Sequence, residues 1–464
     1  MMSAPVINDF TVNVATVNGS GSASSNTILA KSIFRMGVPV APKNYFPSNI
    51  AGLPTWYMVR VSERGYRCRS GRQEVVIALN PSTAAKDVAG VDKGGVLIID
   101  EALPQAKDPG RDDIEVFVVP MAQIAKEFAP DVRLRKLLAN MVYVGVAVEL
   151  LGLDREVVMA VVADQFRAKA KIVKLNQDVV QAGIEYARDN FDAAKCPYKV
   201  ESRTLTKDKL LVEGNTAAAL GCLMGGCTFV GWYPITPSSS LCEEFISFAK
   251  QHRVDDDGKA RWAQVQAEDE LASLGLVLGA GWAGARAMTS TSGPGISLMA
   301  EFAGFGYYAE IPAVIFDVQR VGPSTGMPTR TQQGDIALCR YLSHGDTEHI
   351  LILPAGPEEL YELSMQSFDL AERYPTPIFV LTDLDMGMNY WISEPFVYPE
   401  KPLDRGKVLD KAALDQVQEY ARYKDVDGDG IPYRTLPGTA HPKAPYFTRG
   451  SGHTEAAEYT EDSD

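Results

Sequence analysis

The sequence predicts an α/β protein in which two successive domains each form around a sheet covered by helices. Short apolar runs recur along the chain, and most are followed by segments whose apolar residues repeat with a helical period. From residue 214 onward strands and helices alternate, which is typical of a parallel sheet covered on both faces. A chain of 464 residues, 46% of them hydrophobic, can bury several domain cores.

The first domain, residues 1–191, begins with a strand at 11–17 that leads through a glycine/serine turn into a helix at 26–35. Three further apolar runs predict strands at 74–79, 95–99 and 114–119. Four helical patterns follow, at 122–128, 133–151, 154–166 and 176–191. Residues 192–213 are polar without a clean period, so we expect a linker there.

The second domain spans residues 214–392. Its expected helices lie at 214–226, from 241 onward, and at 267–281, 296–307 and 357–373. Its expected strands lie at 227–232, 286–290, 313–318, 349–353 and 377–382. In residues 393–464 proline and charge increase and only 411–423 has a helical pattern, so an extended C-terminal segment is expected.

Composition and charge restrict the classes of partner. A formal net charge of −14 argues against nucleic acid or an anionic membrane as the main partner. No apolar run reaches membrane-spanning length and residues 1–10 lack the pattern of a signal peptide, so a cytoplasmic location is expected. The six cysteines are scattered rather than clustered, so we expect any iron–sulfur cluster to lie on another polypeptide.

Two motifs imitate sites that their surroundings do not support. The Asn-Gly-Ser-Gly-Ser loop at 18–22 resembles a dinucleotide-binding turn, but the third glycine and a suitable downstream acid are missing. The aspartate-rich segment at 425–430 resembles a calcium loop, yet Leu436 stands where the twelfth-position glutamate belongs. We therefore interpret Asp425–Asp429 as a turn, and a nicotinamide site at 18–22 remains a minor alternative.

A proline-bounded turn is the most informative segment. Residues 233–240 read Tyr-Pro-Ile-Thr-Pro-Ser-Ser-Ser and follow an apolar run that we interpret as a buried strand. Proline restricts both itself and the residue before it, so the turn is stiff and presents Thr236 at the carboxyl end of that strand. Ligands bind at such strand ends in open α/β sheets, although a serine or threonine there can simply cap the next helix.

Three other segments also carry polar groups to strand ends. Gln-Ala-Glu-Asp-Glu at 266–270 is expected to open an apolar helix and to place Glu268 at its partly desolvated mouth, although acids are common in a first helical turn. Arg320 closes the strand at 313–318, and the following loop carries Thr329 and Arg330. Thr-Ser-Thr-Ser-Gly-Pro-Gly at 289–295 offers glycines for close approach of a ligand.

Together these segments resemble the α subunit of the 2-oxoacid:ferredoxin oxidoreductases, with the γ domain fused in front. The resemblance rests on the motifs at 233–240, 266–270 and 289–295, on 319–331, and on Thr-Asp-Leu-Asp-Met-Gly-Met-Asn at 382–389. The 2-oxoglutarate-type branch is the most similar. The expected fold is therefore a γ-type α/β domain, a thiamine pyrimidine-binding α/β domain and an extended, proline-rich C-terminal segment.

The resemblance implies roles for individual residues in a thiamine diphosphate-dependent reaction. Glu268 would contact the aminopyrimidine ring, Thr236 the substrate or the cofactor, and Arg320 the 2-oxoacid carboxylate. Thr329 and Arg330 would provide further substrate contacts. The remaining cofactor contacts would come from the backbone around two turns, at Pro234, Ile235, Ser292 and Gly293.

The same resemblance implies partners. A β subunit would carry the Mg²⁺–diphosphate motif and a 4Fe-4S cluster, and the assembly would be a dimer of αβ heterodimers that uses coenzyme A and ferredoxin. Fused chains of this family usually continue into a further α/β domain beyond the point where this sequence stops. A non-catalytic scaffold subunit is the alternative function.

Overall fold

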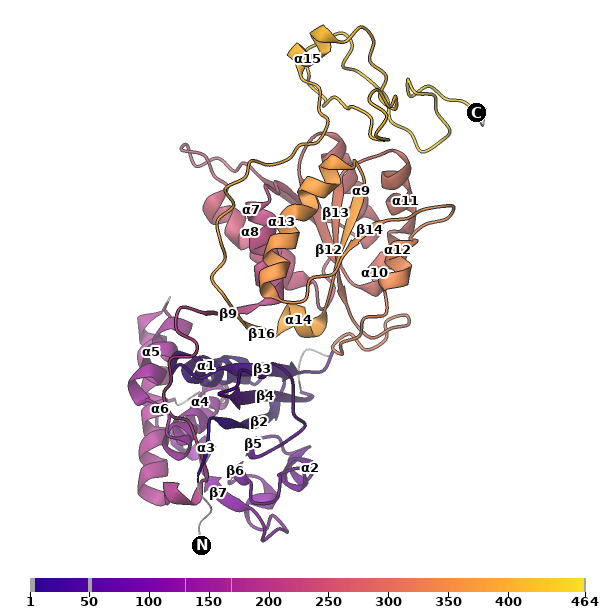
Figure 1. The fold of residues 1–464 in the computed structure, drawn as a ribbon. Helices are drawn as coiled ribbons and strands as arrows, with labels where there is room; N and C mark the ends of the chain where they lie inside the picture. The colour runs from indigo at the N-terminus through magenta and orange to yellow at the C-terminus, as the bar shows by residue number, and fades with distance from the viewer. Residues whose placement is uncertain (1–4, 49–51, 130, 168, 463–464) are drawn as a thin grey trace. The chain divides into compact units, whose positions relative to one another are not determined.

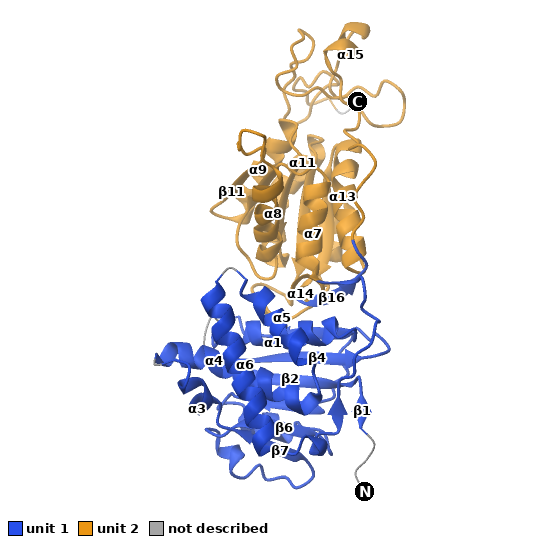
Figure 2. Cartoon of the chain, turned by 90° about the vertical axis from the view of Figure 1, so that its left-hand side faces the viewer, with its two compact units in different colours: residues 1–211, 389–395 blue, residues 212–388, 396–464 orange. Residues whose placement is uncertain are grey.

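The computed structural model describes residues 5–48, 52–129, 131–167 and 169–462. The chain divides into two compact units, one of Met1–Leu211 with Asn389–Pro395 and one of Val212–Met388 with Phe396–Asp464 (Figure 2). Each unit contains a six-stranded sheet with helices packed against it (Figure 1). The predicted α/β class is confirmed. Within the described ranges, no helix is both long enough and apolar enough to cross a membrane.

The sheet of the first unit is mixed. Its strand order is β3-β4-β2-β5-β6-β7. The pairs β3–β4 and β4–β2 are antiparallel, and the pairs β2–β5, β5–β6 and β6–β7 are parallel. The bounds are β2 (Asp9–Val17), β3 (Val40–Tyr45), β4 (Pro54–Ser62), β5 (Val75–Ala78), β6 (Val96–Asp100) and β7 (Glu115–Val119). The sequence missed β3, because Pro42 and Lys43 interrupt the apolar run of this edge strand, where proline is tolerated. It also missed β4, the interior strand that pairs with β3 and β2.

Five helices, α1, α3, α4, α5 and α6, share a core with one face of this sheet, and the short helix α2 packs on the other face. The bounds are α1 (Ser22–Arg35), α2 (Ala84–Ala89), α3 (Met121–Lys126), α4 (Val132–Leu151), α5 (Arg155–Gln165) and α6 (Ala170–Asn190). Asp131 caps α4 by accepting the Leu134 N–H at 2.8 Å, and Gly152 ends it in the left-handed conformation. From Leu138 onward α4 is almost entirely buried, because it packs between the sheet and α6.

Residues 192–211 are folded into the first unit rather than forming the expected linker. Strand β8 (Tyr198–Lys199) pairs with β1 (Val6–Ile7), and the Arg203 N–H donates to the Met36 carbonyl at 2.8 Å. Gly37 makes this path possible: a Cβ there would lie 1.8 Å from the Arg203 carbonyl oxygen. Three alternating residues of this segment, Cys196, Tyr198 and Val200, are buried in the core of the first unit, a repeat too short to stand out in a polar sequence.

The sheet of the second unit is wholly parallel. Its order is β11-β10-β12-β13-β15-β14. The bounds are β10 (Phe229–Trp232), β11 (Ala263–Gln266), β12 (Ala287–Thr291), β13 (Ala313–Gln319), β14 (Ile350–Ile352) and β15 (Pro377–Asp383). The sequence missed β11, an edge strand whose four residues are all exposed. Such a strand lacks the apolar run that identifies a buried one.

Two helical layers cover the parallel sheet, one built on α7, α8 and α13 and the other on α9, α10, α11 and α12. The bounds are α7 (Gly214–Met224), α8 (Ser239–His252), α9 (Glu270–Trp282), α10 (Gly293–Leu298), α11 (Ala300–Tyr308), α12 (Ile336–Arg340), α13 (Pro357–Arg373), α14 (Leu384–Met388) and, in the C-terminal segment, α15 (Lys411–Gln416). The predicted helix at 296–307 is two short helices, because the α10 turn ends at Met299.

The order of the strands creates a switch point between β10 and β12. After β10 the chain moves outward to β11 and then returns to the other side of β10 as β12. Strands β10 and β12 pair only at Phe229↔Ala287 and Val230↔Met288, so their carboxyl ends separate. A crevice at this position is where open α/β sheets bind ligands.

Buried charges attach the C-terminal segment to the second unit. Glu372 of α13 accepts Arg286 Nε at 2.8 Å, Arg405 at 3.0 Å and Arg434 at 3.3 Å. The side chains of Glu372 and Arg434 are each 4% exposed. Two of these three arginines, Arg405 and Arg434, belong to the segment after residue 395. Their ion pairs with Glu372 attach this largely irregular segment to α13.

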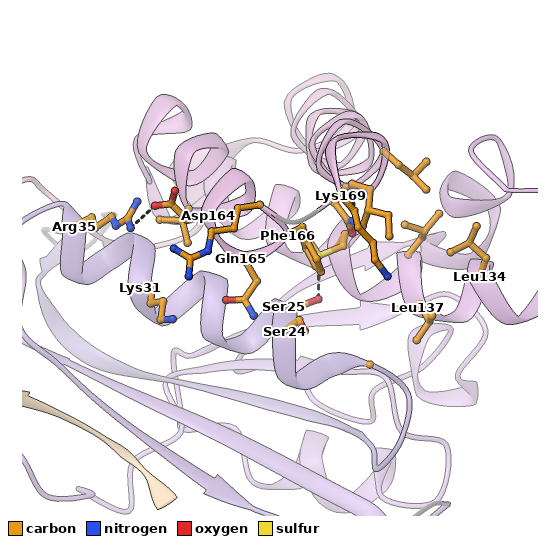
Figure 3. Close-up of a pocket in the computed structure, with 18 residues that line it drawn as sticks. Ser24, Ser25, Lys31, Arg35, Leu134, Leu137, Asp164, Gln165, Phe166 and Lys169 are labelled. Carbon is orange, nitrogen blue, oxygen red and sulfur yellow. Dashed lines mark hydrogen bonds and ion pairs between the residues drawn. The ribbon is translucent and has the colours of Figure 1, made fainter. Parts of the chain in front are cut away.

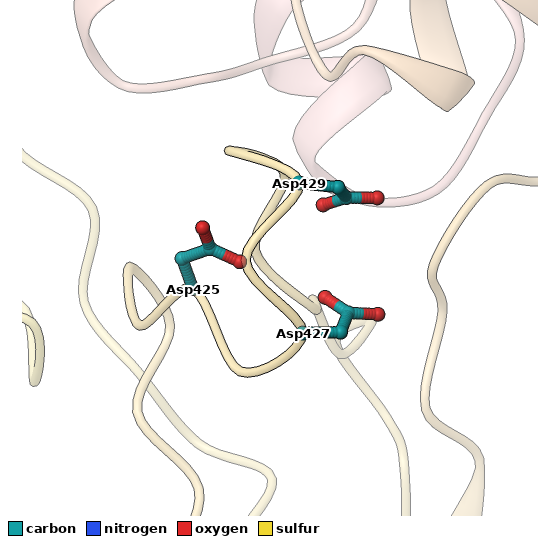
Figure 4. A group of neighbouring side chains, drawn as sticks. All are labelled: Asp425, Asp427 and Asp429. Atoms are coloured by element: carbon teal, nitrogen blue, oxygen red, sulfur yellow. The ribbon is translucent and has the colours of Figure 1, made fainter.

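A lysine from outside the aspartate-rich turn pairs with two of its carboxylates. Figure 4 shows Asp425, Asp427 and Asp429 around one loop, and their carboxylate oxygens lie within 4.8 Å of one another. The Lys407 ammonium donates to Asp427 and Asp429 at 2.6 Å and to the Ile431 carbonyl at 2.9 Å. The lysine therefore compensates the carboxylates that a metal ion would need.

Native thiol reactivity should be restricted to Cys68. The other five cysteines are buried free thiols. Burial raises the pKa of Cys222, Cys227 and Cys242, and the reactive form is the thiolate. We expect a thiol reagent to label one cysteine per folded chain and all six after unfolding, measured by mass spectrometry. Substitution Cys68→Ser should remove the native labelling, and fast labelling of a second site would contradict this burial.

Candidate active site

The turn after β10 holds Thr236 at the switch point. Asn215 of α7, 1% exposed, fixes the turn by donating to the Pro237 carbonyl at 2.9 Å and to Ser240 Oγ at 2.7 Å. The Ser238 N–H also donates to the Ile235 carbonyl at 2.9 Å, and the Thr236–Pro237 peptide bond is cis. The turn is therefore held from within and from a neighbouring helix. Tyr233 and Pro234 are exposed at its start.

Arg320 joins this turn to the loop that follows β13. One of its terminal nitrogens donates to the Thr236 carbonyl at 2.7 Å and the other to the Thr325 carbonyl at 3.2 Å. The residue is 8% exposed, and its Nε has no acceptor in the described chain. Burial lowers the pKa of Arg320, with Glu270 acting in the opposite direction. A guanidinium nevertheless remains charged, so one donor and the cationic charge are available to an anion.

Glu268 lies before a helix rather than in its first turn. Strand β11 extends through Gln266, and α9 begins at Glu270 with Asp269 as its N-cap, which accepts the Ala272 N–H at 2.7 Å. The predicted helix start at 266–267 is therefore wrong: an N-cap aspartate and a strand ladder compete successfully for these residues. The Ala267 N–H donates to the Trp232 carbonyl at 2.9 Å, which holds Glu268 beside the end of β10.

The Glu268 carboxylate is exposed in this chain. No hydrogen bond or ion pair links it to Thr236 or Arg320 within the described residues. The sequence predicted partial desolvation, which this chain alone does not provide. Val265 of the preceding strand and Leu276 of the following helix are each 38% exposed, so large apolar side chains are exposed on both elements that flank the acid in sequence.

The segment after β12 completes the crevice. Ser292 is fully buried and its Oγ has no partner in the described chain. The glycines serve internal packing: a Cβ on Gly293 would lie 2.8 Å from Asp335 Oδ2, and one on Gly295 would lie 1.9 Å from Thr291 Oγ1. Close contacts within the protein therefore explain both glycines, and their contact with a ligand stays a prediction.

The loop at 322–335 carries the two remaining candidates. Thr329 is 7% exposed, and Arg330 donates to its carbonyl at 2.7 Å and to its Oγ1 at 3.2 Å. The backbone carbonyl of Arg330 accepts the Val321 N–H at 2.9 Å, so the two ends of this part of the loop are joined. Thr329 and Arg330 thus form one local unit, and Arg320 connects the start of this loop to Thr236.

Two functional candidates were missed by sequence reasoning. Asn215 anchors the Thr236 turn, yet in sequence it is a single polar residue at the start of a small-residue helix. Glu270 is 6% exposed and acts electrostatically on Arg320. A buried acid at the start of an apolar helix was indistinguishable in sequence from the two acids that precede it.

The first unit contains a separate cavity of about 1060 Å³ between α1, α4, α5 and α6 (Figure 3). Its walls include apolar residues such as Leu138 and Met141 together with the cations Lys31, Arg35, Arg167 and Lys169. Asp164 forms an ion pair with Arg35 at 2.5 Å. Helices and their connections line this cavity, and the 18–22 turn meets it only through Gly21.

Comparison with known proteins identifies the family. Residues 220–418 match the family described as "Pyruvate flavodoxin/ferredoxin oxidoreductase, thiamine diP-bdg", and residues 11–186 match "Pyruvate ferredoxin/flavodoxin oxidoreductase". The 2-oxoacid:ferredoxin oxidoreductase 2 subunit alpha of Aeropyrum pernix is 30% identical over 98% of this chain and 76% of the relative. The 2-oxoglutarate synthase subunit KorA of Methanocaldococcus jannaschii is 44% identical over 38% of this chain and 46% of the relative.

A solved structure has a similar fold over almost all of this chain. The 2-oxoglutarate:ferredoxin oxidoreductase from Magnetococcus marinus, with 2-oxoglutarate, coenzyme A and succinyl-CoA bound, superposes with a TM-score of 0.84 at 29% identity. The alignment covers 98% of this chain and 76% of that one. The chain belongs to the 2-oxoacid:ferredoxin oxidoreductase family. Within this family of enzyme complexes it is a fused γ/α subunit, as the sequence predicted.

Proposed function

We propose that this subunit takes part in the oxidative decarboxylation of a 2-oxoacid, with 2-oxoglutarate as the favoured substrate. The products are an acyl-CoA, carbon dioxide and ferredoxin reduced by the two electrons released. The observation that carries this proposal is the switch point of the second unit, where the Thr236 turn, Arg320 and the Ser292 segment meet. The KorA relatives and the structure with 2-oxoglutarate bound support the choice of substrate.

The crevice residues fit a thiamine diphosphate ring. Ser292 offers a buried hydroxyl without a partner, Glu268 a carboxylate at the adjoining edge, and Pro234, Ile235 and Gly293 a restrained backbone. When bound, the cofactor would supply the carbon nucleophile and store the electron pair left by carbon dioxide. Glu268 would hold a proton at the aminopyrimidine ring, which requires it to be covered and partly desolvated in the assembled enzyme.

The substrate would lie beside the Thr236 turn. Arg320, buried and with its Nε unpaired, would bind the 2-oxoacid carboxylate, because a guanidinium pairs well with carboxylates. The Thr236 hydroxyl would orient the substrate. Thr329 and Arg330 would contact its distal end. The hydrogen bond from Arg320 to the Thr236 carbonyl makes these groups one positioned set.

A β subunit would complete the site and supply Mg²⁺ and a 4Fe-4S cluster. Two features of this chain support a partner at that edge: β11 is an edge strand, and a groove lined by apolar residues that include Leu276 and Phe302 lies against α9. In the described residues, the potential metal ligands that approach one another closely are Asp425, Asp427 and Asp429, and none is a thiolate. We expect a dimer of αβ heterodimers that reduces ferredoxin.

The exposed Glu268 carboxylate favours one alternative, a non-catalytic scaffold for the partner. The native complex should be purified and assayed for thiamine, iron, acid-labile sulfide and turnover. Together these measurements distinguish a catalytic subunit from a scaffold. We expect 2-oxoglutarate-dependent ferredoxin reduction that requires coenzyme A and both subunits. A complex with all three components whose turnover survives Glu268→Gln would support the scaffold function instead.

Substitution Arg320→Lys should lower kcat/KM for the 2-oxoacid by about 10- to 100-fold, because a charged hydrogen bond contributes roughly 1.5–3 kcal/mol. The lysine keeps the charge but cannot reproduce the fork that reaches two carbonyls. The matched control is Arg340→Lys, whose partly exposed side chain pairs with Glu348 on the surface. Steady-state kinetics with both variants check the effect, and equal kinetics for the two would remove Arg320 from the substrate site.

A further inference from the structure

The cavity of the first unit has the size of a site for a small organic ligand. Its volume of about 1060 Å³ is slightly above the roughly 300–1,000 Å³ that is usual for ligand pockets. Helix α1 forms one wall and contributes Ser24, Ser25, Lys31 and Arg35. At about 1.5 Å per residue, Ser24 and Arg35 lie about 16 Å apart along the helix axis. The cavity is therefore elongated along α1.

Most of the remaining wall is apolar. Leu138 and Met141 of α4 and Val161 of α5 line the cavity, and each is at most 2% exposed. Leu137 and Ile172 also line it and are 41% and 36% exposed. A ligand with an apolar chain would remove these groups from water, and burial of apolar surface is the dominant favourable contribution to most association.

The charged lining is predominantly positive. Four cations, Lys31, Arg35, Arg167 and Lys169, line the cavity together with one acid, Asp164. Asp164 pairs with Arg35 at 2.5 Å, so the acid is already compensated. The other three cations give the cavity a positive charge in a chain whose formal net charge is −14. This charge favours an anionic ligand.

Arg167 and Lys169 are the cations available to a ligand. Both are exposed and lie on the connection between α5 and α6. Neither side chain forms an ion pair or a hydrogen bond with another residue that the structure describes. The Lys169 side chain projects toward α1 (Figure 3). A carboxylate or phosphate in the cavity would therefore meet two cations without displacing an existing partner.

We propose that this cavity binds a single-chain amphiphile with an anionic head, a long-chain carboxylate or phosphate. The chain would lie along α1 against Leu138, Met141 and Val161, and the head would pair with Arg167 and Lys169. The site is built from residues of the first unit, and it does not depend on the proposed function.

The polar lining suits an amphiphile better than a nucleotide, which needs several convergent hydrogen-bonding groups. The Asn176 amide already donates to the Ile172 carbonyl at 2.8 Å, and Ser25 Oγ lies 3.1 Å from Met141 Sδ. The 18–22 turn is closed to a ligand at Gly21, because a Cβ there would lie 2.5 Å from Leu137 Cδ2. The glycine at this point serves packing within the protein.

Calorimetric titration of the native complex with dodecanoate, kept below its micelle concentration, tests the site. We expect saturable binding that weakens at high salt, because exposed charges are screened. Each methylene removed from the chain should weaken binding by roughly fourfold. Dodecyl phosphate should compete with dodecanoate, and the tighter of the two identifies the preferred head. Dodecyltrimethylammonium, which has the same chain and a cationic head, should not compete.

Substitution Lys169→Glu should weaken dodecanoate binding by about fivefold or more, the effect of one exposed ion pair. Lys171→Glu is the matched control: it makes the same change of charge at an exposed residue of α6 that does not line the cavity, and it should bind as the wild type does. Ile172→Ser should weaken binding without changing its salt dependence, because it removes apolar wall and no charge.

Four outcomes would overturn the proposal. They are no saturable binding of dodecanoate to the native complex, equal affinities for Lys169→Glu and Lys171→Glu, equal binding of the cationic amphiphile, and displacement of dodecanoate by an equal concentration of adenosine diphosphate. The last would assign the cavity to a phosphate-bearing ligand that needs no apolar chain.

Discussion

Replacing Glu268 by glutamine should lower turnover by about 10²- to 10⁴-fold, the usual contribution of a positioned general acid–base group. The amide keeps the size of the side chain but cannot share a proton with the aminopyrimidine ring. Because Glu268 lies outside α9 and caps nothing, the change should leave folding intact. The measurement is 2-oxoacid-dependent ferredoxin reduction by the assembled complex, with subunit content and thiamine content determined in parallel.

The matched control is Glu362→Gln, an exposed glutamate of α13. It should retain wild-type turnover, which shows that loss of one surface charge has no effect by itself. Near-normal activity of Glu268→Gln in a complex that contains thiamine would refute the role. So would a carboxylate that stays in bulk solvent after assembly, since an ordinary glutamate is ionised near neutral pH and holds no proton to share.

Replacing Glu372 by alanine should destabilise the second unit by about 3–5 kcal/mol, the cost of leaving buried charges without their partner. Arg286, whose side chain is 1% exposed, would keep one carboxylate, Asp369 at 2.7 Å, and the carbonyls of Gly225 and Asp404. Arg434, whose side chain is 4% exposed, would lose its carboxylate. Denaturant unfolding measures the loss, and limited proteolysis should cut first after residue 395 because Arg405 and Arg434 fix that segment.

The comparison variant is Arg373→Ala. Its side chain is 55% exposed and pairs with Asp404 at 3.8 Å, so its loss should cost roughly 0.2–1 kcal/mol at most. Equal unfolding midpoints for Glu372→Ala and the wild type would show that the buried cluster contributes no net stability. In that case, a hydrophobic replacement of similar volume would serve the fold equally well.

The polar turns at the carboxyl ends of strands in the second unit could be predicted from sequence, because the signals for them are local. Two prolines and an apolar run defined the Thr236 turn, and the structure places that turn after β10. The fused γ/α architecture was predicted and is confirmed by the comparisons. The roles of Thr236, Glu268, Arg320 and the other site residues remain predictions.

What escaped sequence analysis depends on contacts between distant residues. Strand β11 is exposed and carries two glutamines, so its pairing with β10 leaves no apolar signature. Glu268 was expected at a desolvated helix mouth, but the position of a helix start depended on whether Asp269 or an earlier residue became the cap.

Strand β16 (Tyr390–Ser393) gives the polypeptide an interlaced path. Residues 389–395 belong to the first unit although the second unit precedes and follows them. The Asn44 N–H donates to Asn389 at 2.8 Å, and Lys43 lies over the Trp391 ring. Cleavage of the backbone at residue 211 would therefore yield two fragments that still share one fold, because the larger fragment carries a piece of the smaller. Such fragments should therefore reassociate. If the gene were split at this point, residues 389–395 of the second product would still bind the first product.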